Sequence, residues 1–200
     1  MKKIAVFFLS LSVLAGCGGF DSVEKRKNDE YGKLDGLFTK AREFTEIIEF
    51  FDFTSEDSRE MAGTLKQIEE EFGPRVQIKR FPYSLGKPEV VAEASECARS
   101  QEKFQEFTDE YFANHFGKSD EDTLLEIALR ISLNKDDFSS CLSSGIGKSR
   151  LAQYKELGDA NNIDKIPSFL VDKEVTFSGT MPKENLSNLV TERLATPVEY

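Results

Sequence analysis

The strongest constraint on the fold is an apolar segment that runs directly into a helical one, followed by an alternating segment. Residues 44–53 are rich in isoleucine, phenylalanine and threonine and predict a buried strand. In residues 58–72 the apolar side chains recur at helical spacing, and Gly73 and Pro74 end the helix. Apolar and polar residues alternate in 75–84, which predicts a second strand. This order predicts two parallel strands joined by a crossover helix.

The rest of the chain predicts a block of helices and then a hairpin. The helical pattern covers about 88–158. Its breaks fall in turns of small or polar residues: 117–120, Asn134 and 143–147. Residues 165–180 predict two short strands that turn at Asp172 and Lys173. Pro182 then opens the last helix as its first residue.

The N-terminal segment, 1–16, predicts a secretory signal that is not part of the fold. Lys2 and Lys3 precede an apolar run that is too short to span a bilayer, and small residues follow it. The sequence Leu-Ala-Gly-Cys at 14–17 resembles a bacterial lipobox, which implies cleavage before Cys17 and lipidation of that residue. Gly18 implies, by the same resemblance, the outer membrane with the protein facing the periplasm. The alternative is an ordinary signal peptide with a chance cysteine.

The acidic composition restricts the classes of partner. The formal net charge is −10, and no run of basic residues is arranged as a nucleic-acid groove requires. Losing Lys2 and Lys3 with the signal changes −10 to −12, so electrostatic attraction would not hold the protein to anionic lipid. Solubility alone accounts for the acidity. We therefore expect a membrane contact through the lipid anchor and no nucleic-acid partner.

The corner between the first strand and its helix consists of Ser55, Glu56, Asp57 and Ser58. A helix N-terminus stabilises negative charge, so such corners often carry chemistry. Asp57 and Glu60 have the spacing of a capping box, and a helix cap is the simplest interpretation. The alternative is a cation site at Glu56 and Asp57, although two carboxylates without further ligands make a poor one.

The corner and several later segments resemble the DsbA-like family of exported thiol-disulfide oxidoreductases. The matching segments are IIEFFDFTSEDSREM, RFPYSLGKPEVVAEASECARSQEKFQEFTDEYF, DDFSSCLSSG and KIPSFLVD. The resemblance runs from about Phe44 to Val190 and implies an α/β thioredoxin fold with an inserted helical domain, about 88–158. It implies a DsbA-like domain over 44–193, between a lipidated tether, 17–43, and a C-terminal tail, 194–200.

The sequence departs from this family at the redox centre. In the family a Cys-x-x-Cys motif opens the first helix, whereas Ser55 and Ser58 hold those positions here. Thiol-disulfide exchange needs a thiolate that attacks a disulfide sulfur, and a serine hydroxyl cannot replace it. The resemblance therefore implies a non-catalytic polypeptide-binding protein or envelope assembly factor. We expect neither a cofactor nor a metal.

The family's cis-proline loop matches Ile166 and Pro167. In active relatives this loop hydrogen-bonds an extended substrate, so the resemblance implies that segments of exported proteins bind here. Ile166 and Phe169 would supply the apolar contacts, and Glu56 and Asp57 would favour basic segments. The alternative is that Pro167 only preserves the fold.

The resemblance also implies roles for three further residues, Glu49, Cys97 and Cys141. Glu49 matches an acid that helps to move protons beneath the redox pair, and without thiols it is interpreted as a buried relic. Cys97 and Cys141 match a second, structural disulfide of some relatives, and an exported compartment permits such a bond. The rival function is an oxidoreductase or isomerase that acts through Cys97 and Cys141.

Overall fold

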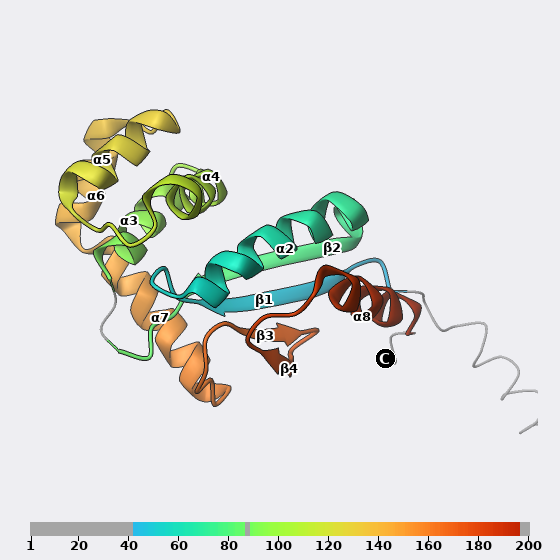
Figure 1. Ribbon diagram of the computed structural model, residues 1–200. Helices are drawn as coiled ribbons and strands as arrows, with labels where there is room; N and C mark the ends of the chain where they lie inside the picture. Colours follow the sequence, from blue (N-terminus) through green and yellow to red (C-terminus); the bar gives the residue numbers. More distant parts are fainter. Residues whose placement is uncertain (1–41, 87–88, 197–200) are drawn as a thin grey trace, which may run out of the picture. The chain divides into compact units, whose positions relative to one another are not determined.

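The sheet of this computed structural model has four strands in the order β2–β1–β3–β4 (Figure 1). Their bounds are β1 (Thr45–Phe51), β2 (Val76–Pro82), β3 (Ser168–Val171) and β4 (Glu174–Ser178). β1 and β2 are parallel, and β3 is antiparallel to both β1 and β4. The predicted parallel pair and the predicted hairpin are confirmed. Asp172 and Lys173 form the turn at positive φ angles of 52° and 75°.

The structure describes residues 42–86 and 89–196. The predicted signal segment, the lipidation of Cys17, nearly all of the tether and the end of the C-terminal tail lie outside these residues. None of the helices in the described ranges is both long enough and apolar enough to cross a bilayer.

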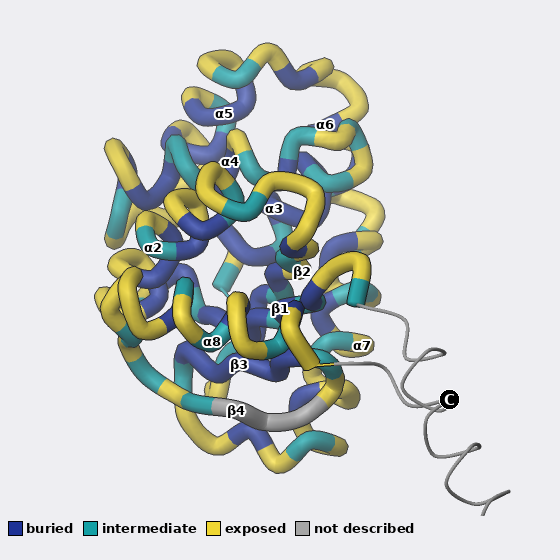
Figure 2. Tube along the Cα trace, turned by 90° about the vertical axis from the view of Figure 1, so that its right-hand side faces the viewer, coloured by how far each residue is buried: buried dark blue, intermediate teal, exposed yellow. Residues whose placement is uncertain are grey.

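Two helices cover one face of the sheet, α2 (Glu56–Phe72) and α8 (Lys183–Ala195). Alternation along β1 directs Ile47 to this face, where it meets the apolar stripe of α2 and the inner side of α8. The fully buried members of this layer include Met61, Ile68, Phe169, Val171, Leu186 and Val190. Figure 2 shows the same pattern, with buried positions along β1 and β3 and exposed turns on the outer sides of the helices.

A helical block is inserted between β2 and β3 (Figure 1). Its elements are α3 (Val90–Arg99), α4 (Phe104–Glu110), a π-helical turn (Tyr111–His115), α5 (Glu121–Arg130), α6 (Lys135–Ser144) and α7 (Ile146–Ala160). The predicted breaks near 117–120, Asn134 and 143–147 are confirmed, but a break at 100–103 was missed. Glu102 has φ 60° there, in the left-handed region that a continuous helix cannot contain.

Two helix starts differ from the predicted ones. α2 begins at Glu56 rather than Ser58, because Ser55 is the cap. Pro182 is the residue before α8 rather than its first residue. α7 runs two residues past 158, to Ala160. It lies against β2, and its Gly158 faces the ring of Tyr83, the residue after β2.

Candidate functional site

The two serines of the corner bind backbone groups. Ser55 caps α2, and its Oγ accepts a hydrogen bond from the N–H of Ser58 at 3.2 Å. The Oγ of Ser58 accepts from the N–H of Asp52 at 3.2 Å. The prediction that Asp57 caps the helix is therefore wrong: the capping position lies two residues earlier, and Asp57 is in the first turn. Both hydroxyl groups hold the chain reversal between β1 and α2.

Exposure separates the serines from the acids. Ser58 is fully buried and Ser55 is half-buried, whereas Glu56 and Asp57 are exposed. The carboxylates lie in the first turn of α2, where the helix dipole favours negative charge. Glu56 also lies 3.8 Å from Arg59. Within 42–86 and 89–196, no three His, Cys, Asp or Glu side chains are placed to hold a metal ion.

The Ile166–Pro167 peptide bond is cis, and it lies at the same end of the sheet as the corner. The β1–β3 register pairs Phe50 with Ser168, so Pro167 lies beside the C-terminal end of β1, which leads into Ser55. The carbonyl of Pro167 accepts from the N–H of Gly179 at 2.7 Å. Among the described residues, neither the N–H nor the C=O of Ile166 takes part in a hydrogen bond.

Only one of the two apolar residues predicted for this loop is accessible. Ile166 is half-buried, whereas Phe169 is fully buried in the layer between the sheet and α2. The prediction that Phe169 contacts a bound peptide is therefore wrong. β-strand alternation explains this error, because Phe169 points to the face of the sheet that α2 and α8 cover.

Glu49 lies beneath the corner and forms a buried ion pair with Arg80. The two residues are partners in the β1–β2 register, and their side chains are 0% and 4% exposed. The guanidinium also lies 4.6 Å from the ring centre of Phe51. Burial raises the pKa of Glu49, and the charge of Arg80 opposes that rise. Within the described chain, Oε1 of Glu49 and both terminal amino groups of Arg80 lack hydrogen-bond partners.

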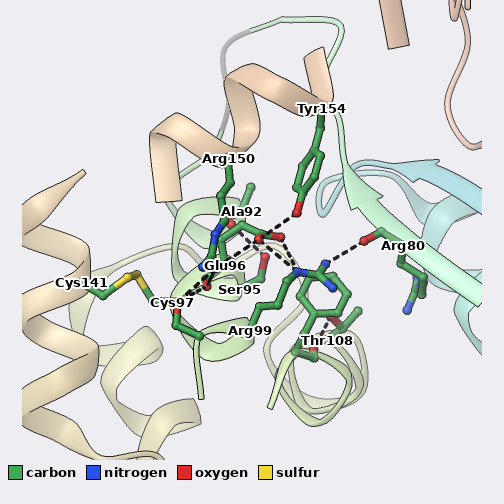
Figure 3. A network of polar contacts seen from close by, with 12 residues as sticks. Arg80, Ala92, Ser95, Glu96, Cys97, Arg99, Thr108, Cys141, Arg150 and Tyr154 are labelled. Carbon is green, nitrogen blue, oxygen red and sulfur yellow. Dashed lines mark hydrogen bonds and ion pairs between the residues drawn. A yellow bond between two sulfur atoms is a disulfide. The ribbon is translucent and has the colours of Figure 1, made fainter. Parts of the chain in front are cut away.

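A second polar network connects the helical block to β2 (Figure 3). The carboxylate of Glu96 is fully buried and accepts from Nε of Arg99 at 3.0 and 3.1 Å and from the hydroxyl of Tyr154 at 3.1 Å. Arg99 also donates to the carbonyl of Arg80 at 2.8 Å. Arg150 donates to the carbonyl of Glu96 at 2.9 Å. Sequence reasoning missed this network, because its charges are spaced like those of a solvated helix face.

Cys97 and Cys141 form a disulfide that joins α3 to α6. The predicted pair is thus present, and its residues are 1% and 9% exposed within the apolar core of the helical block. The 44-residue separation corresponds, in the chain-entropy model, to about 4 kcal/mol of stabilisation. The corner accordingly holds two hydroxyls that accept backbone hydrogen bonds, and the disulfide lies elsewhere, in the core of the helical block.

Comparisons with known proteins found similarity at the level of structure only. No protein-family model and no curated protein matches the sequence. A thioredoxin-like oxidoreductase from Silicibacter pomeroyi DSS-3 is 22% identical, with a TM-score of 0.64 over 76% of this chain and 89% of that one. The thiol-disulfide exchange protein alpha-DsbA2 from Wolbachia pipientis is 17% identical, with a TM-score of 0.65 over 86% and 96%.

BdbD from Bacillus subtilis is also similar, at 16% identity and a TM-score of 0.64 over 78% of this chain and 90% of that one. All three chains are covered over most of their length, so the similarity includes both the sheet and the inserted helices. The predicted α/β fold is confirmed. The chain has the thioredoxin-like fold with an inserted helical block that DsbA-like proteins share.

Proposed function

We propose that this chain is a non-catalytic polypeptide-binding protein of the bacterial cell envelope. The observation that carries the proposal is that both serine hydroxyls accept backbone hydrogen bonds, Ser55 from the N–H of Ser58 and Ser58 from the N–H of Asp52. In a redox centre of this fold, two thiols would occupy those positions and exchange a disulfide with a substrate. The corner keeps its backbone geometry without a group that can attack sulfur.

The rival function, exchange through Cys97 and Cys141, has less support. Exchange begins when a thiolate reaches a disulfide sulfur, so at least one sulfur must be accessible. Cys97 is 1% exposed and lies in the C-terminal half of α3, away from the helix N-terminus that would lower a thiol pKa. Cys141 is 9% exposed. Both features favour a structural disulfide.

The bound polypeptide would pair with the backbone of Ile166. The free N–H and C=O of this residue offer one donor and one acceptor to an extended segment, as in strand addition. The exposed carboxylates of Glu56 and Asp57 favour a basic segment, and this preference should weaken as salt rises. Without covalent capture we expect a dissociation constant on the order of 1 μM, about 8 kcal/mol.

Site-specific crosslinking in intact cells tests this function. A photoreactive amino acid at position 55 or 166 should capture polypeptides, and the same amino acid at Glu156, exposed on α7, serves as the control. Capture at 55 and 166 above that at 156 is the expected result. Equal capture at all three positions would contradict binding at the corner.

The proposal places the protein on the outer membrane, facing the periplasm, through a lipid on Cys17. Several acyl chains on one residue anchor a protein firmly, whereas a single chain does not. Wild type should enter the detergent phase of a phase-separation extract, and Cys17→Ser should not be lipidated. Wild type in the aqueous phase would show that the lipobox assignment is wrong.

A further inference from the structure

An open hollow of about 470 Å³ lies among α3, α5 and α6. Four of its lining residues are apolar: Leu124 is buried, Leu125 and Leu142 are half-buried, and Val90 is 50% exposed. Three serines also line it: Ser119, Ser139 and Ser143. Glu93 and Glu121 stand among the lining residues. Its volume lies within the range of sites that hold small ligands or several side chains.

A smaller cavity lies between the start of α3 and the residues that precede the serine corner. Glu89, which precedes α3, lines this cavity of about 20 Å³ together with Asp52 and Phe53, which precede the corner. The next residue, Val90, lines the larger hollow. Consecutive Cα atoms are about 3.8 Å apart, so the two depressions each have a lining residue within that distance of the other.

The negative charge of Glu93 and Glu121 beside the hollow favours a ligand that carries positive charge. In the ranges that the structure describes, Glu121 makes no ion pair, and its side chain is exposed. The carboxylate of Glu93 lies 3.9 Å from Lys148, which is 71% exposed and therefore displaceable. Apolar lining residues beside two carboxylates fit a large apolar side chain flanked by lysine or arginine.

We infer that this hollow, defined by Val90, Leu124, Leu125, Leu142, Glu93 and Glu121, is a second subsite for the bound polypeptide. The inference rests on the proposed polypeptide binding at the corner and specifies its ligand. The segment runs past Glu89 and places an apolar residue with a basic neighbour in the hollow. The protein therefore selects extended segments that combine basic and apolar residues.

The test measures binding of a fluorescent, unstructured peptide rich in leucine, lysine and proline to the mature protein. Matched peptides replace its leucines by serine or its lysines by glutamate. Val90→Asp and Glu121→Lys alter the hollow at exposed positions. Leu129→Asp, on α5 at a residue that is 64% exposed and does not line the hollow, is the apolar control. Glu156→Lys, on α7, is the charge control.

Val90→Asp and Glu121→Lys should each weaken binding roughly fivefold to tenfold, and the two control variants should change it less than about twofold. Both altered peptides should also bind more weakly to wild type. If Glu56→Lys weakens binding while Val90→Asp and Glu121→Lys match their controls, the corner binds polypeptide and the second subsite does not exist. If wild type fails to bind the first peptide, the subsite and the proposed function both fail.

Discussion

At the scale of single residues, Ser55 and Ser58 can bind backbone groups at the start of α2 but cannot exchange disulfides. A serine oxygen accepts a backbone hydrogen bond well, and a helix N-terminus offers several unsatisfied N–H groups. Ser55 satisfies one of them, and Ser58 satisfies the N–H of Asp52 on the strand side. The hydroxyls thus stabilise the corner, and they do so without the sulfur that exchange requires.

Removing the cap should destabilise the protein measurably. Ser55→Ala leaves the N–H of Ser58 without its acceptor and should lower the free energy of unfolding by about 1 kcal/mol. Ser149→Ala, at an exposed serine on α7, is the matched control and should change it by less than about 0.5 kcal/mol. Urea denaturation checks both. If the two substitutions lower the free energy of unfolding equally, the Ser55 cap does not stabilise α2.

The buried Glu49 should make stability depend on pH. Burial raises the pKa of Glu49 from its usual value of 4.5, so the folded protein retains a proton that the unfolded chain has released. Its contribution to stability is present below the unfolded pKa and is lost as pH rises through the folded pKa. Glu49→Gln lacks this titration, so it should gain stability relative to wild type as pH rises above 4.5.

Urea denaturation of wild type and Glu49→Gln over a series of pH values measures that difference. Both proteins share the carboxylates with lowered pKa, so the pH-dependent contributions of these groups cancel in the comparison. One example is Asp120, whose pKa is lowered by hydrogen bonds from Thr123. If the free energy of unfolding of Glu49→Gln minus that of wild type stays constant or falls with rising pH, Arg80 outweighs burial at Glu49.

At the scale of elements, two glycines on different helices should respond oppositely to alanine. A Cβ on Gly158 of α7 would lie 2.3 Å from the ring of Tyr83, whereas nothing lies within 4 Å of one on Gly63 of α2. Gly158→Ala should therefore cost about 1–3 kcal/mol by overpacking against β2. Gly63→Ala should stabilise by roughly 0.5–1 kcal/mol, because alanine favours a helix interior.

Thermal unfolding of the two alanine variants checks this prediction. The melting temperature should fall for Gly158→Ala and rise for Gly63→Ala. A rise for Gly158→Ala would mean that α7 does not pack closely against Tyr83, and a fall for Gly63→Ala would contradict the open space beside that residue.

Local pattern predicted most elements of this fold, and tertiary contacts decided the rest. The strands, α2 and the hairpin follow from apolar periodicity and turn residues such as Asp172 and Lys173. The break after Arg99 was not predictable from pattern, since no glycine or proline marks 100–103. At the site, Ser55 and Ser58 were recognised by resemblance, but the burial of Glu96 and Phe169 depends on how distant segments pack.

At the scale of the whole molecule, the helical block contacts the sheet through a hydrogen bond and a shared apolar core. The Cys97–Cys141 disulfide joins α3 to α6, and Arg99 carries a hydrogen bond from α3 to the carbonyl of Arg80 on β2. The apolar core around the disulfide also includes Phe51, from the end of β1, and Phe53, which precedes the corner. These contacts hold the inserted helical block against the sheet without a contribution from the hydroxyls of Ser55 and Ser58.

The most direct test of the central claim measures oxidation of a reduced dithiol peptide by the purified mature protein. A known exchange enzyme serves as the positive control. We predict a rate equal to the uncatalysed background, because the hydroxyls of Ser55 and Ser58 bind backbone N–H groups and the disulfide is buried. A rate above background that disappears in Cys97→Ser would contradict this account and identify the protein as an oxidoreductase that acts through Cys97 and Cys141.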